Sequence, residues 1–177
     1  MMDNNFVVPT AGLAQGRTEF SARALGEFFK SFGNQDILDA DLDVDIAVEK
    51  SGRYFGIDID IRGTVTVECD RCTYPLMLQV DVPVRLSVKF GTPASGGEIS
   101  AEAAIEGGRE IFLADSAAGE IDLNQTVYDF VCTSLPMRRV HPEGECDPAT
   151  VKYLSQSSEE TSSSPFAALK GLIDINN

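Results

Sequence analysis

The sequence predicts an α+β protein: a strongly curved antiparallel β-sheet or partly open barrel, with one main packed helix and a few short helices. Two observations lead to this prediction. Apolar and polar residues alternate over long stretches between residues 42 and 90, a pattern typical of strands with one buried and one wet face. Residues 122–135 instead repeat apolar side chains at helical spacing and stop before Pro136, which disfavours helical continuation.

The first predicted elements are short. Residues 18–32 predict a strand that runs into an amphipathic helix, in which Phe28 and Phe32 recur at helical spacing. Residues 42–48, LDVDIAV, alternate as a half-buried strand does, and the tetrapeptide KSGR at 50–53 predicts a turn.

Two longer alternating runs follow, at residues 55–69 and 76–90. Both exceed the usual strand length of about five or six residues. We therefore expect these strands to bend, twist or break, with Gly63 and Pro83 as the places. Bending strands of this length produces a strongly curved sheet or a partly closed barrel. Residues 110–114 predict a further strand that returns to the sheet.

The segment 122–135 is the main predicted helix. Asp122 is a good N-cap residue with Gln125 three positions on, the spacing of a capping box. Its predicted apolar face consists of Leu123, Val127, Phe130, Val131 and Ser134.

Composition divides the chain into one domain and a tail. Residues 1–154 hold the predicted elements, with residues 91–109, rich in glycine, alanine and acid, as a loop insertion. Residues 155–177 begin with a serine-rich run that is typical of a flexible linker. They end in the short apolar segment PFAALKGLI, which could dock as one or two helical turns.

The chain is strongly acidic, with a formal net charge of −14 from 28 acidic and 14 basic residues. Such a chain is repelled by bare nucleic acid and by anionic membranes unless its basic residues cluster, and they do not cluster strongly. The simpler interpretation is that the acidic residues keep the protein soluble. The more specific interpretation is that they bind a basic protein partner. The N-terminus lacks the pattern of a secretion signal, and no apolar run is long enough to span a membrane. We therefore expect a cytoplasmic protein with no membrane partner.

Two cysteines frame a turn in the sequence VECDRCTYP, at Cys69 and Cys72. Cys69 continues the buried face of the preceding strand and Cys72 begins that of the following strand. With Asp70 and Arg71 as turn residues, both thiols would leave the hairpin on one side. Two thiolates that bind one ion in this way form half of a zinc knuckle. A thioredoxin-like redox pair is less well supported, because that motif lies at a helix N-terminus.

A second ligand pair lies in RRVHPEGEC, which places His141 and Cys146 in an H-x4-C spacing across turn-forming residues. The combined Cys3His set is a recognised arrangement for structural zinc. The alternative is that Cys69 and Cys72 are small buried side chains or an incidental disulfide, with His141 on the surface. Zinc is favoured because two separate ligand pairs occur in the chain and each pair lies across a predicted turn. Cys132 lies off the apolar face of the predicted helix and is not expected to bind metal.

These motifs, in this order, resemble the YceD family. The matching pieces are CDRC, EIDL at the start of a helix, LPMRRVH with a cysteine five residues after the histidine, a serine-rich linker and PFAALKGL. The resemblance runs from about residue 40 to residue 173, and its specific positions are Cys69, Arg71, Cys72, Leu135, Pro136, His141 and Cys146. Arg138 and Arg139 are a departure, because family members often have a second proline there, and they make this loop more basic.

The resemblance implies a metal-binding protein that supports the accumulation of large-subunit ribosomal RNA. Relatives are often encoded beside a small basic ribosomal protein, which suits an acidic partner. We expect a non-enzymatic factor in ribosome biogenesis that contacts a basic ribosomal protein or an assembly factor, and large-subunit ribosomal RNA directly or indirectly. The acids that would attract a basic partner lie on the wet faces of the predicted strands: Asp41, Asp43, Asp45, Asp58 and Asp60.

The alternative function is a direct RNA-binding zinc module. Arg71, Arg138 and Arg139 would lie near the metal and could contact phosphate, or they could only balance the negative charge of three thiolates. An enzyme is not expected, because the histidine is assigned to the metal, no nucleophile–base motif occurs, and four ligands leave zinc no open position. The sequence thus predicts no catalytic residues.

Overall fold

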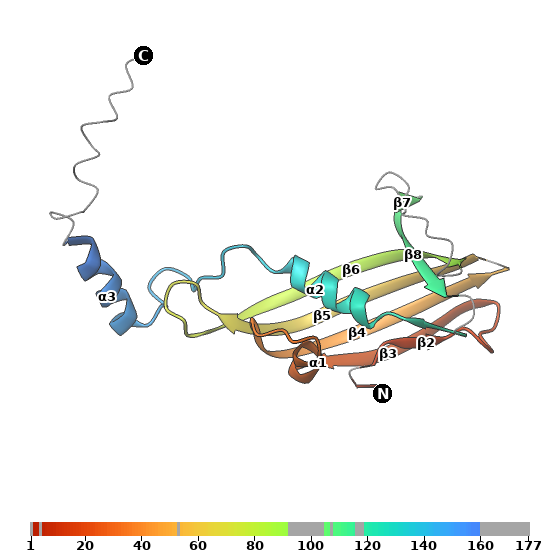
Figure 1. Cartoon of the computed structure of the whole chain (residues 1–177), viewed down its shortest axis with the longest axis horizontal. Helices are drawn as coiled ribbons and strands as arrows, with labels where there is room; N and C mark the ends of the chain where they lie inside the picture. The colour runs from red at the N-terminus through yellow and green to blue at the C-terminus, as the bar shows by residue number, and fades with distance from the viewer. Residues whose placement is uncertain are drawn as a thin grey trace, which may run out of the picture.

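Four long strands form the body of the protein (Figure 1): β3 (Gly16–Leu25), β4 (Ile37–Ser51), β5 (Tyr54–Glu68) and β6 (Pro75–Gly91). The computed structural model describes residues 2–3, 5–52, 54–91, 105–106, 108–115 and 119–159. Each long strand pairs antiparallel with the next one along the chain. The predicted meander is therefore present, with buried and exposed residues alternating along most of its length.

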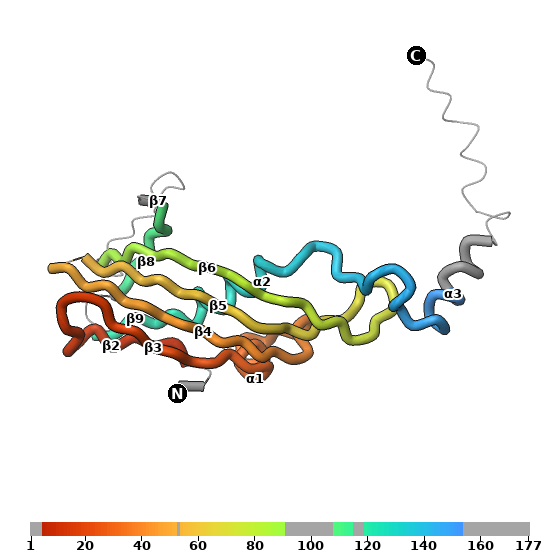
Figure 2. Tube along the Cα trace, turned by 180° about the vertical axis from the view of Figure 1, so that it is seen from behind, coloured from red at the N-terminus to blue at the C-terminus, as the bar shows by residue number. Residues whose placement is uncertain are grey.

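Shorter strands extend this sheet at both sides. β1 (Met2–Asp3) runs parallel to β3, β8 (Arg109–Asp115) runs parallel to β6, and β7 (Ile105–Glu106) runs antiparallel to β8. The order across the sheet is β1-β3-β4-β5-β6-β8-β7, and Figure 2 shows β3 to β6 side by side. The strand predicted at residues 110–114 is β8.

Two parts of the predicted architecture are wrong. The sheet is mixed rather than wholly antiparallel, because the β1–β3 and β6–β8 pairs are parallel. It is also open, since β1 and β7 end the strand order in the described part of the chain, so no barrel forms. Alternation of apolar residues shows which face of a strand is buried, but it carries no information about strand direction or partner. The α+β class with few helices is confirmed.

Gly63 allows β5 to continue unbroken through 15 residues. Its φ is 146°, a backbone conformation that glycine adopts readily and other residues rarely do. A Cβ at this position would lie 2.1 Å from the main-chain oxygen of Asp41 on β4. Gly63 therefore permits the close approach of β4 and β5, and β6 likewise continues through Pro83.

One face of the sheet is covered by helices and a small second sheet. The covering elements are α1 (Gly26–Ser31), α2 (Asn124–Ser134) and the antiparallel pair of β2 (Val7–Pro9) with β9 (Glu120–Asp122). Aromatic rings join them: the centroids of Phe6 and Phe28 are 5.1 Å apart, and Phe32 stacks on Tyr128 at 4.5 Å. All these elements contribute to one continuous core.

The main helix begins later than predicted. Asp122 is the last residue of β9 rather than the N-cap, and Leu123 occupies the N-cap position without a side-chain cap. Asp122 still serves the helix start, because its Oδ1 accepts a 2.8 Å hydrogen bond from the main-chain N–H of Asn124. The pairing of β9 with β2 holds Asp122 in a strand, and this pairing between distant segments is not visible in local sequence. The helix ends at Ser134, before Pro136, as predicted.

A third helix, α3 (Pro148–Glu159), is an element that the sequence pattern did not predict. It continues into residues 155–159, the start of the expected serine-rich linker. The rest of that predicted linker and apolar segment, residues 160–177, lies outside the described residues, as do residues 92–104 and 107 of the predicted loop insertion. None of the helices in the described ranges is long and apolar enough to cross a membrane.

The other face of the sheet carries acids and arginines together. Ion pairs join Arg23 to Asp41 and Asp43, Arg62 to Asp81, Arg85 to Asp58 and Asp60, and Arg109 to Asp58. Part of the predicted acidic surface is therefore neutralised by its own arginines. Asp45 differs, because it lies directly opposite another acid, Asp60, in the β4–β5 register.

Candidate metal centre

Three cysteines and the histidine meet at the end of the sheet where β5 turns into β6. One potential ligand atom each from Cys69, Cys72, His141 and Cys146 lies within 4.8 Å of the other three. The three thiols are buried, with Cys69 and Cys72 exposed to 1% or less. We call these four residues the Cys3His cluster. The structure thus brings together all four residues that the sequence predicted as ligands.

The first pair is positioned by the tip of the β5–β6 hairpin. The N–H of Cys69 donates to the carbonyl of Tyr74, and the carbonyl of Cys69 accepts from Thr73, both over 2.9 Å. Thr73 adopts a left-handed φ of 62°, a conformation that a residue with a side chain adopts only where its surroundings demand it. The connection is longer than the predicted two-residue turn at Asp70 and Arg71, because strand pairing ends at Glu68 and Pro75 and Cys72 itself lies in the turn. Both thiols are nevertheless buried on the core side of the sheet, as predicted.

The second pair is positioned by a turn after α2. The N–H of Glu145 donates to the carbonyl of Pro142 over 3.1 Å, and Gly144 has a φ of 88°. A glycine with positive φ at the third position is the requirement of a type II turn. The turn folds the chain back between His141 and Cys146, so that both side chains converge on the hairpin tip.

Hydrogen bonds between the two loops fix their relative position. The N–H of Asp70 donates to the carbonyl of Arg139 over 2.7 Å, and the N–H of Arg139 donates to Oδ2 of Asp70 over 2.6 Å. The imidazole is fixed as well: Nδ1 of His141 lies 3.4 Å from Sγ of Cys72, and Nε2 lies 3.1 Å from the carbonyl oxygen of Pro75. A histidine ligand usually donates its second ring N–H in this way, which selects the tautomer.

Main-chain N–H groups make two of the three thiols more acidic, whereas burial and the two neighbouring sulfurs raise the pKa of Cys146. Burial raises the pKa of Cys69, but N–H groups of Cys72, Arg71 and His141 that donate to its sulfur outweigh burial and lower the pKa to about 6. Burial also raises the pKa of Cys72, yet N–H groups of Asp147 and Tyr74 bring it below its usual value. A thiolate is the form of cysteine that binds metal. Hydrogen-bonded thiolates at this position therefore suit a cation.

The donor set fits a tetrahedral metal ion. Bonds of about 2.3 Å to sulfur and about 2.0 Å to nitrogen place the ligand atoms of a zinc site roughly 3.4–3.8 Å apart. The separations in the cluster extend to 4.8 Å at most, and Sγ of Cys72 and Nδ1 of His141 are already 3.4 Å apart. A small contraction would therefore complete the site. Three soft sulfur donors with one imidazole favour zinc over magnesium or calcium, which prefer oxygen.

The remaining predicted residues fall into two groups. Arg71 and Arg138 are exposed, whereas Arg139 is half-buried and its Nε lies 3.6 Å from Oδ1 of Asp70. Arg139 thus serves the joint between the two loops. Cys132 lies apart from the cluster on α2, where its sulfur is 3.6 Å from Nδ2 of Asn34.

Sequence reasoning missed two residues that support the cluster, Asp70 and Asp147. Oδ2 of Asp147 accepts hydrogen bonds from the N–H and the hydroxyl of Thr150, over 2.8 and 2.9 Å, and so caps α3 directly after Cys146. The signal was present in the sequence DPAT, where an N-cap aspartate precedes a proline at the first helical position. For Asp70 no local signal exists, because its partner Arg139 is far away in sequence.

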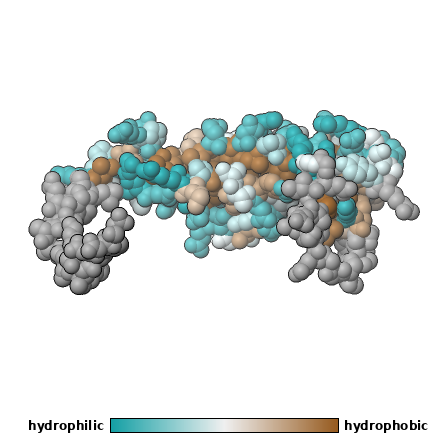
Figure 3. Space-filling view, turned by 90° about the horizontal axis from the view of Figure 1, so that it is seen from above, coloured by the Kyte–Doolittle hydropathy of each residue, from teal (hydrophilic) through white to brown (hydrophobic). Residues whose placement is uncertain are grey.

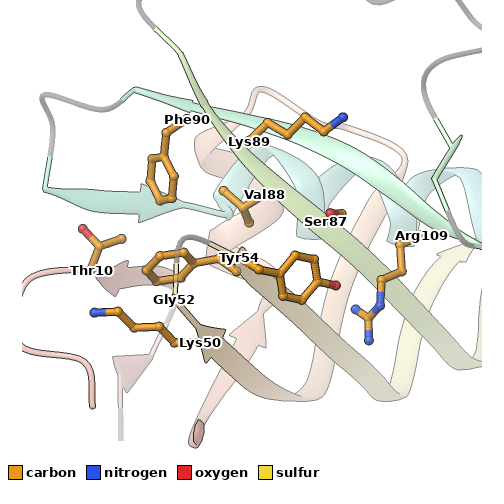
Figure 4. Close-up of a pocket in the computed structure, with 10 residues that line it drawn as sticks. Thr10, Lys50, Gly52, Tyr54, Ser87, Val88, Lys89, Phe90 and Arg109 are labelled. Carbon is orange, nitrogen blue, oxygen red and sulfur yellow. The ribbon is translucent and has the colours of Figure 1, made fainter. Parts of the chain in front are cut away.

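A cavity of about 1060 Å³ lies at the other end of the sheet, near the β4–β5 turn (Figure 4). Its lining includes Lys50 and Arg109, which Figure 4 shows on opposite sides. The ammonium group of Lys50 donates to the carbonyl of Leu13 over 3.0 Å, and Arg109 is bound to Asp58 at 2.7 Å. These cations already have partners and do not converge on one point. The Cys3His cluster is therefore the better-defined functional site.

The chain was compared with families, curated proteins and solved structures. Searches of the curated proteins and of the solved structures found no match. The family model described as "Large ribosomal RNA subunit accumulation protein YceD" matches residues 57–173. This range contains nearly all of β5, all of β6 and α2, and the whole Cys3His cluster. The matched range covers well over half of the chain, and the chain belongs to the YceD family.

Proposed function

We propose that this protein is a non-enzymatic, cytoplasmic factor in ribosome biogenesis, which supports the accumulation of large-subunit ribosomal RNA and is held together by structural zinc. The observation that carries the proposal is the Cys3His cluster, which lies inside the matched family range. The family description names large-subunit ribosomal RNA accumulation. The zinc would be held by Cys69, Cys72, His141 and Cys146.

A structural role for the metal follows from the ligand set. Catalytic zinc sites keep a position for water or substrate, whereas four protein ligands close the coordination sphere. Here the three thiols are buried, and the histidine is fixed on both ring nitrogens. The chemistry that zinc would supply is a crosslink between the hairpin tip and the loop before α3. This crosslink would stabilise a surface rather than act on a substrate.

Contact with a basic protein is supported by charge. The net charge of −14 repels RNA and favours cationic partners. On the uncovered face of the sheet, Asp45 is exposed and faces Asp60 rather than an arginine. A basic ribosomal protein, or an assembly factor with a basic surface, is the partner that this charge fits best.

Direct RNA binding is the second candidate. Arg71 and Arg138 are exposed near the Cys3His cluster, and guanidinium groups bind phosphate well. Acids of the same loops, including Glu143 and Glu145, are exposed as well and weaken the local positive field. Protein contact is therefore the leading candidate.

The metal is tested by elemental analysis of protein purified without chelator. The intact chain should carry close to one zinc ion per molecule, and Cys72→Ser should lose it. Cys132→Ser is the matched control, because it removes a thiol outside the cluster, and it should retain the metal. Absence of metal from the intact chain, or equal metal content in both variants, would contradict the zinc proposal.

The cellular role is tested by deleting the gene and measuring the amounts of large-subunit and small-subunit ribosomal RNA. Large-subunit RNA should fall relative to small-subunit RNA, and the intact chain should restore it. Crosslinking in growing cells then separates the two candidates. A basic protein that stays crosslinked to this chain after RNase treatment supports direct protein contact. Tight binding of purified protein to large-subunit RNA at physiological salt, lost on changing Arg71 and Arg138 to serine, would instead support the RNA-binding module.

A further inference from the structure

Among the residues that the structure describes, one edge of the sheet has no neighbouring strand over much of its length. β6 extends from Pro75 to Gly91, but β8 pairs with residues 86–91 alone. In the described part of the chain, residues 75–85 therefore have β5 as their one strand partner. Alternate residues of an edge strand present unpaired N–H and carbonyl groups to solvent. This stretch can accept another strand.

The free edge of β6 has few of the features that prevent an edge strand from pairing with a further strand. Natural edges are commonly protected by charges, proline, bulges or short length. Between Pro75 and Pro83 the sequence is LMLQVDV, in which Asp81 is the single charged residue. The free part of β3 at the other side of the sheet is shorter, and it carries Arg17 and Glu19.

Apolar side chains lie beside this edge. Met77 is 66% exposed on the wet face, and Leu78 and Val82 are half-buried on the core face. Phe130 of α2 is also half-buried. Figure 3, seen from the side on which β6 and α2 lie, shows an apolar band along the middle of the molecule. An added strand would place every second side chain against this apolar band.

We propose that residues 76–82 of β6 bind an extended, cationic segment of a partner protein by strand addition. The proposal rests on the proposed contact with a basic protein and names the surface for it. Charge favours a cationic occupant: the one charged residue between the prolines is Asp81, which lies 3.4 Å from Nε of Arg62 but keeps a side chain that is 76% exposed, and the whole chain carries −14. A second copy of this acidic chain would be repelled, whereas a segment that alternates apolar and basic residues matches both faces of the edge.

The test uses the full chain and a short fluorescent peptide in which valine and lysine alternate. Fluorescence anisotropy measures its affinity, and hydrogen exchange locates it. Binding should protect those alternate amides of residues 76–82 that point away from β5. The same peptide N-methylated at every residue keeps its side chains and charge but has no amide donors, and it should not bind. Gln79→Lys places a cation on the edge and should weaken binding roughly tenfold or more.

Gln125→Lys is the matched control, because it makes the same change at an exposed position of α2 and should leave affinity unchanged. Equal binding of the N-methylated peptide, or equal effects of the two lysine variants, would overturn the proposal. So would protection, already in the free monomer, of those amides of residues 76–82 that point away from β5, or a dimer that Gln79→Lys dissociates, because the edge would then be occupied by the chain itself. These measurements need no ribosome, so their failure leaves the proposed role in RNA accumulation standing.

Discussion

Asp70 and Arg139 bind each other through both main chain and side chain. The N–H of Asp70 donates to the carbonyl of Arg139 over 2.7 Å, and the N–H of Arg139 donates to the Asp70 carboxylate over 2.6 Å. This pair joins the β5–β6 hairpin tip to the loop that carries His141. The two halves of the Cys3His cluster are therefore held together by hydrogen bonds of their own, which reduces the ordering that metal binding must produce.

Replacing Asp70 should weaken metal binding without removing a ligand. Asp70→Ala deletes the acceptor for Arg139, and loss of such supporting contacts typically costs about 10–100-fold in metal affinity. Competition with a chelating dye measures the affinity. Glu68→Ala removes a neighbouring exposed acid as the control and should bind metal as the intact chain does. Equal affinities for the two variants would show that the Asp70–Arg139 pair does not support the cluster.

The tautomer of His141 is the second prediction. Nε2 faces the carbonyl oxygen of Pro75 and Nδ1 faces Cys72, so the zinc-loaded protein should carry its ring proton on Nε2. Nitrogen chemical shifts of the labelled imidazole distinguish the two tautomers directly. A proton found on Nδ1 in the zinc-loaded protein would mean that His141 binds through the other nitrogen or not at all.

Gly63 should tolerate no side chain. A Cβ would lie 2.1 Å from the main-chain oxygen of Asp41, so Gly63→Ala must separate β4 from β5, at a cost of roughly 3 kcal/mol or more. Gly12 is the matched control: its φ of 89° is also positive, but nothing lies within 4 Å of the added Cβ. Gly12→Ala should cost only about 1 kcal/mol. Urea unfolding of both variants measures the difference, and similar costs would refute the close-approach argument.

Asp45 is expected to lower the free energy of unfolding of the native protein. It lies opposite Asp60, and like charges in direct cross-strand pairs are destabilising. Asp45→Asn retains an oxygen to accept the hydrogen bond from Ser21 and should stabilise the fold by about 0.2–1 kcal/mol. The gain should shrink near 1 M salt, where the Debye length is only about 3 Å.

Asp43→Asn is the control for this prediction, because Asp43 lies opposite Arg62 and 3.7 Å from Nε of Arg23. Its replacement should not stabilise the protein. Thermal unfolding at low and high salt compares the two variants. If both are equally stable, the like-charge pair carries no measurable energy. If Asp45→Asn is more stable yet binds a basic partner more slowly, Asp45 is retained for attraction rather than for stability.

Much of the Cys3His cluster could be predicted because its determinants are local. The spacing of Cys69 and Cys72 between two alternating strands predicts that both thiols lie on one side of a hairpin, although the turn is longer than predicted and includes Cys72. The proline and glycine between His141 and Cys146 predict a second turn. The position of Cys132 on the helix likewise separated it from the cluster. The contact between Asp70 and Arg139 could not be predicted, since these two residues meet only when distant segments are brought together.

Local sequence was enough to predict the strands of the meander, their buried faces and the presence of a turn at each ligand pair. Each of these depends on side-chain period or on turn chemistry, which act over a few residues. Only the assembled fold determines that β1 pairs in parallel with β3 and β8 in parallel with β6, that Asp122 joins β9 instead of capping α2, and that arginines neutralise part of the acidic face. Within the described ranges, the fold also leaves residues 75–85 of β6 at an edge of the sheet. Strand direction, pairing and edge exposure depend on which distant segments meet, and alternating hydrophobicity is the same for every partner a strand could have.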